Sequence, residues 1–186
     1  LEKYQQYSRI ARGLEKADLV LKNARIVNVF TEEIIRGDIA IQDGIIAGIG
    51  SFHGKEERDL AGRYVCPGFI DSHLHLESTL VTPAELVTVA SRHGTTTFIV
   101  DPHESANVSG LAGIDYILDQ TEDVKANVYV MMPSCVPATA IDDNGCTLTA
   151  EDMAPYLHNS RILGLGEVMD SISVVQGEKS MHDKLE

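Results

Sequence analysis

The feature that most constrains this fold is an alternation of short apolar strands and amphipathic helices that begins at Pro67. Strands that alternate with helices form a parallel sheet with helical crossovers. We therefore predict an α/β fold of four strand–helix units over residues 67–186. In order, the units pair strand 67–77 with helix 83–93, strand 95–100 with helix 109–120, strand 127–132 with helix 149–157, and strand 161–168 with helix 174–186.

Two different patterns precede these units. Residues 1–16 carry Tyr4, Tyr7, Ile10 and Leu14 at a spacing that predicts one amphipathic helix. Residues 17–66 hold short β-branched runs and predict a small all-β module. Within it, the Asp43-Gly44 pair favours a tight hairpin turn, because both residues tolerate positive φ.

The first predicted strand carries His73 and His75. Side chains two residues apart on a strand share a face, so both imidazoles suit one divalent metal ion. Asp71 falls on the same side, as does Glu77 if the strand extends that far. A His-x-His pair also arises by chance on ordinary surface strands, which is the alternative interpretation.

Polar residues follow the other strands as well. Asp101, His103 and Glu104 follow the second strand, Cys135 follows the third and Glu167 ends the fourth. Carboxyl ends of parallel strands meet at one edge, so these groups are expected near the histidines. On the fourth strand Glu167 falls on the same face as Leu163 and Leu165, so it is expected to point inward. An inward carboxylate needs a metal ion or, as the alternative, a lysine or arginine partner.

Several roles stay open at this level. Asp101 and His103 are predicted to lie on a turn, where either orients a ligand or contacts substrate, and Asp101 alternatively caps the turn. Cys135 is a metal ligand or, more commonly for a single cysteine after an apolar strand, a small buried hydrophobe. His93, His158 and His182 are interpreted as structural or exposed.

Charge and composition exclude some classes of partner. The chain has 15 Lys and Arg against 28 Asp and Glu, a formal charge of −13, which opposes binding to nucleic acid. No apolar run approaches the roughly 20 residues of a membrane helix, so no membrane partner is expected. The three cysteines show no paired spacing, which favours a reducing, cytoplasmic setting.

Four stretches together resemble a known family. They are Pro67–Glu77, Asp101-Pro102-His103-Glu104, Ser134-Cys135-Val136-Pro137-Ala138 and Gly164–Asp170. The first is similar to the first barrel strand of the amidohydrolase superfamily of metal-dependent hydrolases. In this order and at these intervals, the four resemble the branch of that superfamily that deaminates adenine. The resemblance extends from about residue 18 to the end.

The resemblance implies a (β/α)8 barrel, of which residues 67–186 hold the first four βα units. Such a barrel needs about 250 residues, so the chain is expected to be the N-terminal part of a longer protein. Residues 17–66 are then part of a composite β-sandwich. The catalytic acid–base group and the remaining ligands are expected beyond residue 186, and the complete enzyme is expected to be a homo-oligomer.

The implied activity is hydrolytic deamination of adenine to hypoxanthine and ammonia, in purine salvage. The implied cofactor is a divalent metal, binuclear and bridged by Glu167, with Mn, Fe and Zn all suited to histidine and carboxylate ligands. The implied metal ligands are His73, His75 and Glu167. The residues expected to orient these ligands or to contact the substrate are Glu77, Asp101, His103 and Glu104.

Two other functions remain open. One is another amidohydrolase acting on a cyclic amide or amidine, such as a dihydroorotase or an imidazolonepropionase. The Asp101–Glu104 motif and Glu167 in place of a barrel lysine count against the former. The other is a non-catalytic metal-binding half-barrel that is stable only as an oligomer.

Overall fold

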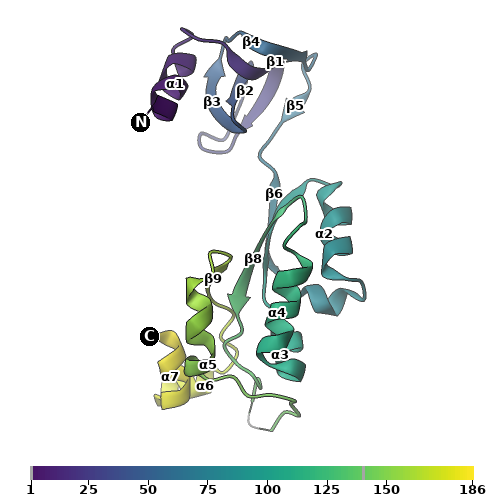
Figure 1. Ribbon diagram of the computed structural model, residues 1–186, viewed down its shortest axis with the longest axis vertical. Helices are drawn as coiled ribbons and strands as arrows, with labels where there is room; N and C mark the ends of the chain where they lie inside the picture. The colour runs from purple at the N-terminus through teal and green to yellow at the C-terminus, as the bar shows by residue number, and fades with distance from the viewer. Residues whose placement is uncertain (1, 140) are drawn as a thin grey trace. The chain divides into compact units, whose positions relative to one another are not determined.

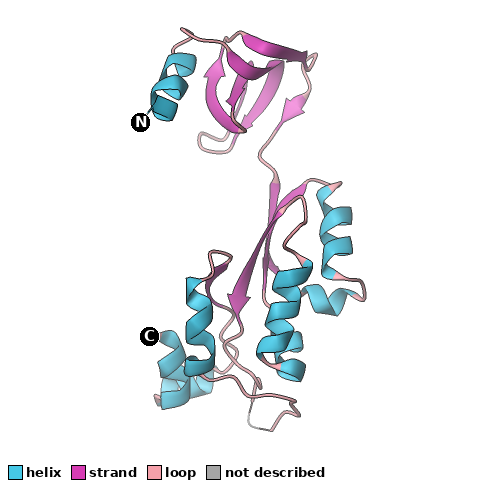
Figure 2. Ribbon diagram, viewed as in Figure 1, coloured by secondary structure: helices cyan, strands magenta, loops and turns pink. Residues whose placement is uncertain are grey.

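The computed structural model describes residues 2–139 and 141–186, and it divides the chain into two compact units. The first unit extends to Pro67 and the second is Gly68–Glu186. Figure 2 shows strands with a single helix in the first unit and alternating strands and helices in the second. Within the described residues, no helix combines the length and apolarity needed to cross a membrane.

The first unit is a five-stranded sheet with one helix. The strand order is β3-β2-β1-β4, and β5 pairs with β1. The predicted helix over residues 1–16 is shorter in the structure, where it ends at Ala11; Leu1 lies outside the described residues. The elements are α1 Glu2–Ala11, β1 Ala17–Asn28, β2 Glu33–Gln42, β3 Ile45–Gly50, β4 Gly54–Asp59 and β5 Tyr64–Val65.

The hairpin predicted at Asp43-Gly44 is confirmed. These two residues join the antiparallel strands β2 and β3 and have φ values of 51° and 75°. Strand β4 was not predicted, because its sequence GKEERD lacks apolar alternation. It pairs with β1 in parallel at one end of the strand order, where charged side chains are typical of an edge strand.

A buried carboxylate, Asp38, stabilises an irregularity of β1. The register of β1 against β2 shifts between Leu21 and Ala24, and Asn23 has a φ of 57°. The Asn23 N–H donates to Asp38 Oδ1 at 3.0 Å, while Lys22 Nζ lies 2.5 Å from Asp38 Oδ2. Burial opposes ionisation, but these bonds and one from the Phe52 N–H lower the pKa of Asp38 below its usual value.

We predict that Asp38→Asn lowers the free energy of unfolding by about 1–3 kcal/mol, because buried donors lose their charged acceptor. Since the pKa of Asp38 is lower in the folded chain than when unfolded, its contribution is complete above pH 3.8 and is lost as the pH falls below that value. Urea unfolding at pH 7 and at pH 3 measures both effects. Glu56→Gln, at a side chain 63% exposed, is the control and should change little. A difference between wild type and Asp38→Asn that grows at pH 3 would contradict this account.

The second unit contains a four-stranded sheet, as the strand–helix alternation predicts. Its order is β6-β7-β8-β9, and all three pairings are parallel. The strands are β6 Phe69–Leu74, β7 Thr95–Val100, β8 Asn127–Met132 and β9 Ile162–Leu165. The helices are η1 Leu76–Thr79, α2 Pro83–Ser91, α3 His103–Ser109, α4 Leu111–Gln120, α5 Ala150–Met153, η2 Ala154–His158, α6 Ser171–Gln176 and α7 Lys179–Leu185.

The core of this unit lies between the sheet and its helices, several of which are visible beside the strands in Figure 1. Burial alternates along β7 and β8, so each strand turns every second residue toward the helices. The buried strand residues are Phe98, Val100, Val128, Val130 and Met132, and the helices contribute Val87, Ala106, Ile114, Ile117, Leu118 and Met153.

Several further predicted elements differ from the structure, among them the helix predicted over residues 149–157, which is the short helix α5 followed by the 3-10 helix η2. The turn predicted at His103 is the start of α3, so a helix begins directly after Pro102. The fourth strand ends at Leu165 rather than at residue 168. The final helix is divided into α6 and α7 by Gly177, whose φ of 73° is left-handed. Strands β7 and β8 have the predicted bounds.

Candidate metal centre

His73 and His75 share one face at the carboxyl end of β6. Leu74 is the register partner of Val100 and packs against the core, so the residues on either side of it point the opposite way. His75 follows the strand but keeps an extended conformation, with φ −105° and ψ 100°. The two Nε2 atoms lie 3.2 Å apart, and the rings meet edge to face.

Glu167 approaches both histidines from the far edge of the sheet. Its Oε1 lies 3.6 Å from the Nε2 atom of His73 and 3.6 Å from that of His75. Because β9 ends at Leu165, strand parity does not determine the direction of this side chain. No lysine or arginine pairs with Glu167 in the described chain, where both of its ion-pair partners are histidines.

The three ligand atoms fit one divalent ion. For metal–ligand bonds of about 2.1 Å, neighbouring ligands are roughly 3.0–3.4 Å apart in octahedral or tetrahedral geometry. The separations here are 3.2, 3.6 and 3.6 Å. Two neutral imidazoles and a carboxylate are a common donor set for Zn, Mn or Fe. These residues could therefore hold a metal ion with little rearrangement.

A second group of ligand atoms adjoins the first through the other nitrogen of His75. His75 Nδ1 lies 2.9 Å from Glu104 Oε2, although the two atoms are not aligned for a hydrogen bond. Together with Glu77, they form another cluster whose ligand atoms lie within 4.8 Å of one another. Carboxylates beside a histidine's second nitrogen commonly orient the ring toward a metal. Glu104 is placed for that role.

Glu77 does not lie on the strand, contrary to the extended reading of residues 67–77. The strand ends at Leu74, and Glu77 is in the 3-10 helix η1. Its Oε1 accepts a hydrogen bond of 3.1 Å from the Ser105 N–H in the first turn of α3, while its Oε2 is buried without a partner. Glu77 thereby connects η1 to the helix that carries Glu104.

Asp101 contacts the Glu167 backbone and does not cap a turn. The residue is 1% exposed, and its Oδ2 accepts a hydrogen bond of 3.3 Å from the Glu167 N–H. Its Oδ1 is buried without a partner, as is Nδ1 of His103 at the start of α3. Buried atoms without partners beside a cluster of ligands suit a site that binds a further polar group.

Burial and charge act differently on the three carboxyl groups around the histidines. Burial raises the pKa of Asp101, although the Glu167 N–H and the nearby imidazoles oppose this shift. Burial also raises the pKa of Glu77, and the neighbouring Glu104 adds to it. Burial opposes ionisation of Glu104 as well, but its backbone hydrogen bond and His75 lower the pKa of this group overall. Of these three groups, only Glu104 has a pKa that is lowered by its surroundings.

The remaining candidates lie apart from these clusters. Cys135 is 2% exposed, and its Sγ accepts a hydrogen bond of 3.3 Å from the Asp170 N–H, as expected for a buried cysteine. His93, His158 and His182 are exposed, and none belongs to a cluster of metal ligands in the described part of the chain. Ser134 stands in one of the four stretches that carry the resemblance, but no role was predicted for it from sequence; it is buried, and its hydroxyl donates to the Glu167 carbonyl.

A parallel sheet whose strand ends gather two imidazoles and several carboxylates is typical of a metal-dependent hydrolase. Residues 64–182 match the model of the amidohydrolase family. The chain belongs to the amidohydrolase family. Members of this family generally use divalent metals, which agrees with the donor set at β6 and after β9.

Several similar proteins carry the name adenine deaminase. The one from Desulfitobacterium hafniense (strain Y51) is 61% identical over 173 residues, which is 93% of this chain and 30% of the relative. The one from Geobacillus kaustophilus (strain HTA426) is 51% identical over 91% of this chain and 30% of the relative. The one from Listeria monocytogenes serotype 4b (strain F2365) is 48% identical over all of this chain and 32% of the relative. The chain thus spans about a third of the length of these relatives.

We predict that Glu167→Ala lowers the metal content of the dialysed protein severalfold or more, because one of three converging ligand atoms is removed. His158→Ala is the matched control, since His158 is exposed at the end of η2 and should leave metal content unchanged. Elemental analysis after equilibrium dialysis against Mn(II) makes the comparison. Equal metal content in Glu167→Ala and wild type would remove Glu167 from the site.

Proposed function

We propose that the chain provides the first part of an enzyme that hydrolyses adenine to hypoxanthine and ammonia. The observation that carries this proposal is the meeting of two His Nε2 atoms and one Glu Oε1 at the carboxyl edge of a parallel sheet. It is supported by relatives named adenine deaminase, which are 44–61% identical to this chain. Because the chain covers about a third of those relatives, the complete activity requires residues outside it.

In this proposal His73, His75 and Glu167 would hold a divalent metal, and the complete centre would be binuclear. Glu104 Oε2 lies beside Nδ1 of His75, where it would orient the ring once a metal is bound, and Asp101 holds the backbone of Glu167. Mn, Fe and Zn all suit these ligands. When bound, such an ion lowers the pKa of a water toward about 7 and supplies a nucleophile for hydrolysis.

The reaction adds water to carbon C6 of the purine and releases the exocyclic amine as ammonia. The part of the chain described here orients the ligands, and its buried carboxyl groups leave polar atoms free to contact the substrate, notably Asp101 Oδ1 and Glu77 Oε2. A general acid–base group must carry a proton to the leaving amine. We assign that group to a residue beyond position 186.

The architecture proposed is a (β/α)8 barrel in which β6, β7, β8 and β9 are the first four strands. Support comes from the parallel order of these strands and from helices after each of them. A barrel of this kind needs about 250 residues. We propose that the small β unit belongs to a composite sandwich, and that the complete enzyme is a cytoplasmic homo-oligomer acting in purine salvage.

The test measures ammonia and hypoxanthine released from adenine by the protein expressed from its full reading frame and loaded with Mn(II) or Fe(II). We expect turnover by wild type and by His158→Ala, and loss of at least a hundredfold in kcat/KM for Glu167→Ala, since the ligand set is broken. Other cyclic amidines and amides are tested in parallel. Turnover of one of these, with none of adenine, would assign a different amidohydrolase activity.

A further inference from the structure

Glu167 lies in the segment that follows β9, outside the paired residues of the sheet. The ladder of β9 ends at Leu165, and the Glu167 side chain is 44% exposed. A carboxylate with this much freedom would lose rotamer entropy when fixed beside two histidines. The position of its backbone therefore matters for how often Oε1 meets both imidazoles.

Hydrogen bonds from the two preceding strands hold this backbone. The Gly166 N–H donates to the Met132 carbonyl at 2.7 Å. The Glu167 N–H donates to Asp101 Oδ2, and the Glu167 carbonyl accepts a short hydrogen bond from Ser134 Oγ. Both polar groups of the Glu167 backbone are thus bonded to residues that are 1% exposed, one after β7 and one after β8.

Gly166 allows this close approach. A Cβ atom at Gly166 would lie 2.1 Å from Asp101 Oδ2 and 3.2 Å from the Met132 carbonyl oxygen. Any larger residue would push the segment away from the end of β8 and separate Glu167 from its two backbone partners. The bonds to Asp101 and Ser134 therefore belong to one close-packed arrangement.

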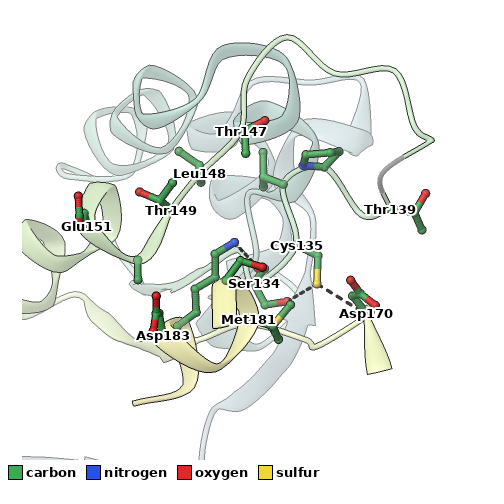
Figure 3. A pocket seen from close by; sticks show the side chains of 15 residues that line it. Ser134, Cys135, Thr139, Thr147, Leu148, Thr149, Glu151, Asp170, Met181 and Asp183 are labelled. Carbon is green, nitrogen blue, oxygen red and sulfur yellow. Dashed lines mark hydrogen bonds between the residues drawn. The ribbon is translucent and has the colours of Figure 1, made fainter. Parts of the chain in front are cut away.

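Cys135, which also follows β8, contacts the chain at Asp170, three residues after Glu167. Cys135 Sγ accepts a hydrogen bond from the Asp170 N–H at 3.3 Å and lies 3.1 Å from Ser134 Oγ, contacts drawn as dashed lines in Figure 3. Asp170 in turn accepts a hydrogen bond from the Ser173 N–H at the start of α6. Residues 166–170 are consequently anchored on both sides of Glu167.

We propose that Ser134 is a positioning residue for Glu167, and that its buried hydroxyl fixes the carboxylate at the distance from His73 and His75 that a metal ion requires. This inference rests on the proposed function only in taking Glu167 as a metal ligand. Without the hydroxyl, the Glu167 carbonyl loses its partner after β8, and the Glu167 backbone itself keeps only the bond from its N–H to Asp101. The carboxylate then samples a wider range of positions.

The experiment measures Co(II) binding to the protein from its full reading frame, by equilibrium titration and by the visible absorption spectrum of the bound ion. For Ser134→Ala we expect a dissociation constant raised about tenfold or more, the range found when residues that orient metal ligands are changed, and a shifted spectrum. Ser134→Thr keeps the hydroxyl and should restore both readouts. Ser134 is one of the residues that line a cavity of about 460 Å³, toward which the added methyl group would have to turn.

Thr121→Val is the matched control. Thr121 is 2% exposed, and its hydroxyl donates to the Ile117 carbonyl at 2.7 Å, but it contacts Arg161 at the opposite end of β9. Its loss should lower resistance to urea about as much as Ser134→Ala does, with Co(II) affinity and spectrum unchanged. Wild-type Co(II) affinity in Ser134→Ala, or an equal loss in Thr121→Val, would overturn the positioning role.

Adenine turnover separates this inference from the proposed function. If wild type releases no ammonia from adenine but Ser134→Ala still loses Co(II) affinity and Ser134→Thr regains it, the positioning role stands and the assigned substrate is wrong. If wild type deaminates adenine and Ser134→Ala binds Co(II) as tightly as wild type, the substrate stands and the positioning role is wrong.

Discussion

The parallel pairing of β6, β7, β8 and β9 is the constraint on which the rest of the second unit depends. In a parallel sheet every strand ends at the same edge, so residues nearly a hundred positions apart in the chain become neighbours. Alternate residues of each strand are buried against the helices, so the residues between them face the opposite side of the sheet, where side chains can bind a ligand. The histidines lie on the face opposite Leu74, and Glu167 reaches them from beyond the fourth strand.

Burial of unpaired polar atoms around the histidines lowers the stability of the fold, and a bound cation or substrate would offset this loss. Asp101, Glu77, His75 and His103 each have a buried polar atom without a hydrogen-bond partner. Buried polar groups without partners are rare in folded proteins and are more common where a ligand belongs. The donor set of the amidohydrolase chain is therefore arranged for binding more than for stability. The first unit differs, since both carboxylate oxygens of its buried Asp38 are bonded.

The two polar contacts to the Glu167 backbone show how a flexible side chain can be placed without being buried. A long carboxylate on an exposed loop has many rotamers, and only a few would bring Oε1 near both imidazoles. Bonds to its N–H and its carbonyl restrain the backbone from which the Glu167 side chain extends. The residues that do so, Asp101 and Ser134, follow the second and third strands of the sheet.

Local patterns in the sequence alone determined the strands β7 and β8, the hairpin at Asp43-Gly44 and the shared face of His73 and His75, because each depends on residues within a few positions of one another. The tertiary structure decided the rest. Strand β4 forms through pairing with β1 despite its charged sequence, and α3 begins directly after Pro102. Glu167 meets the histidines, and Ser134 meets Glu167, through contacts between strand ends distant in the chain. No local periodicity encodes such contacts, since they arise only when the sheet aligns its strands.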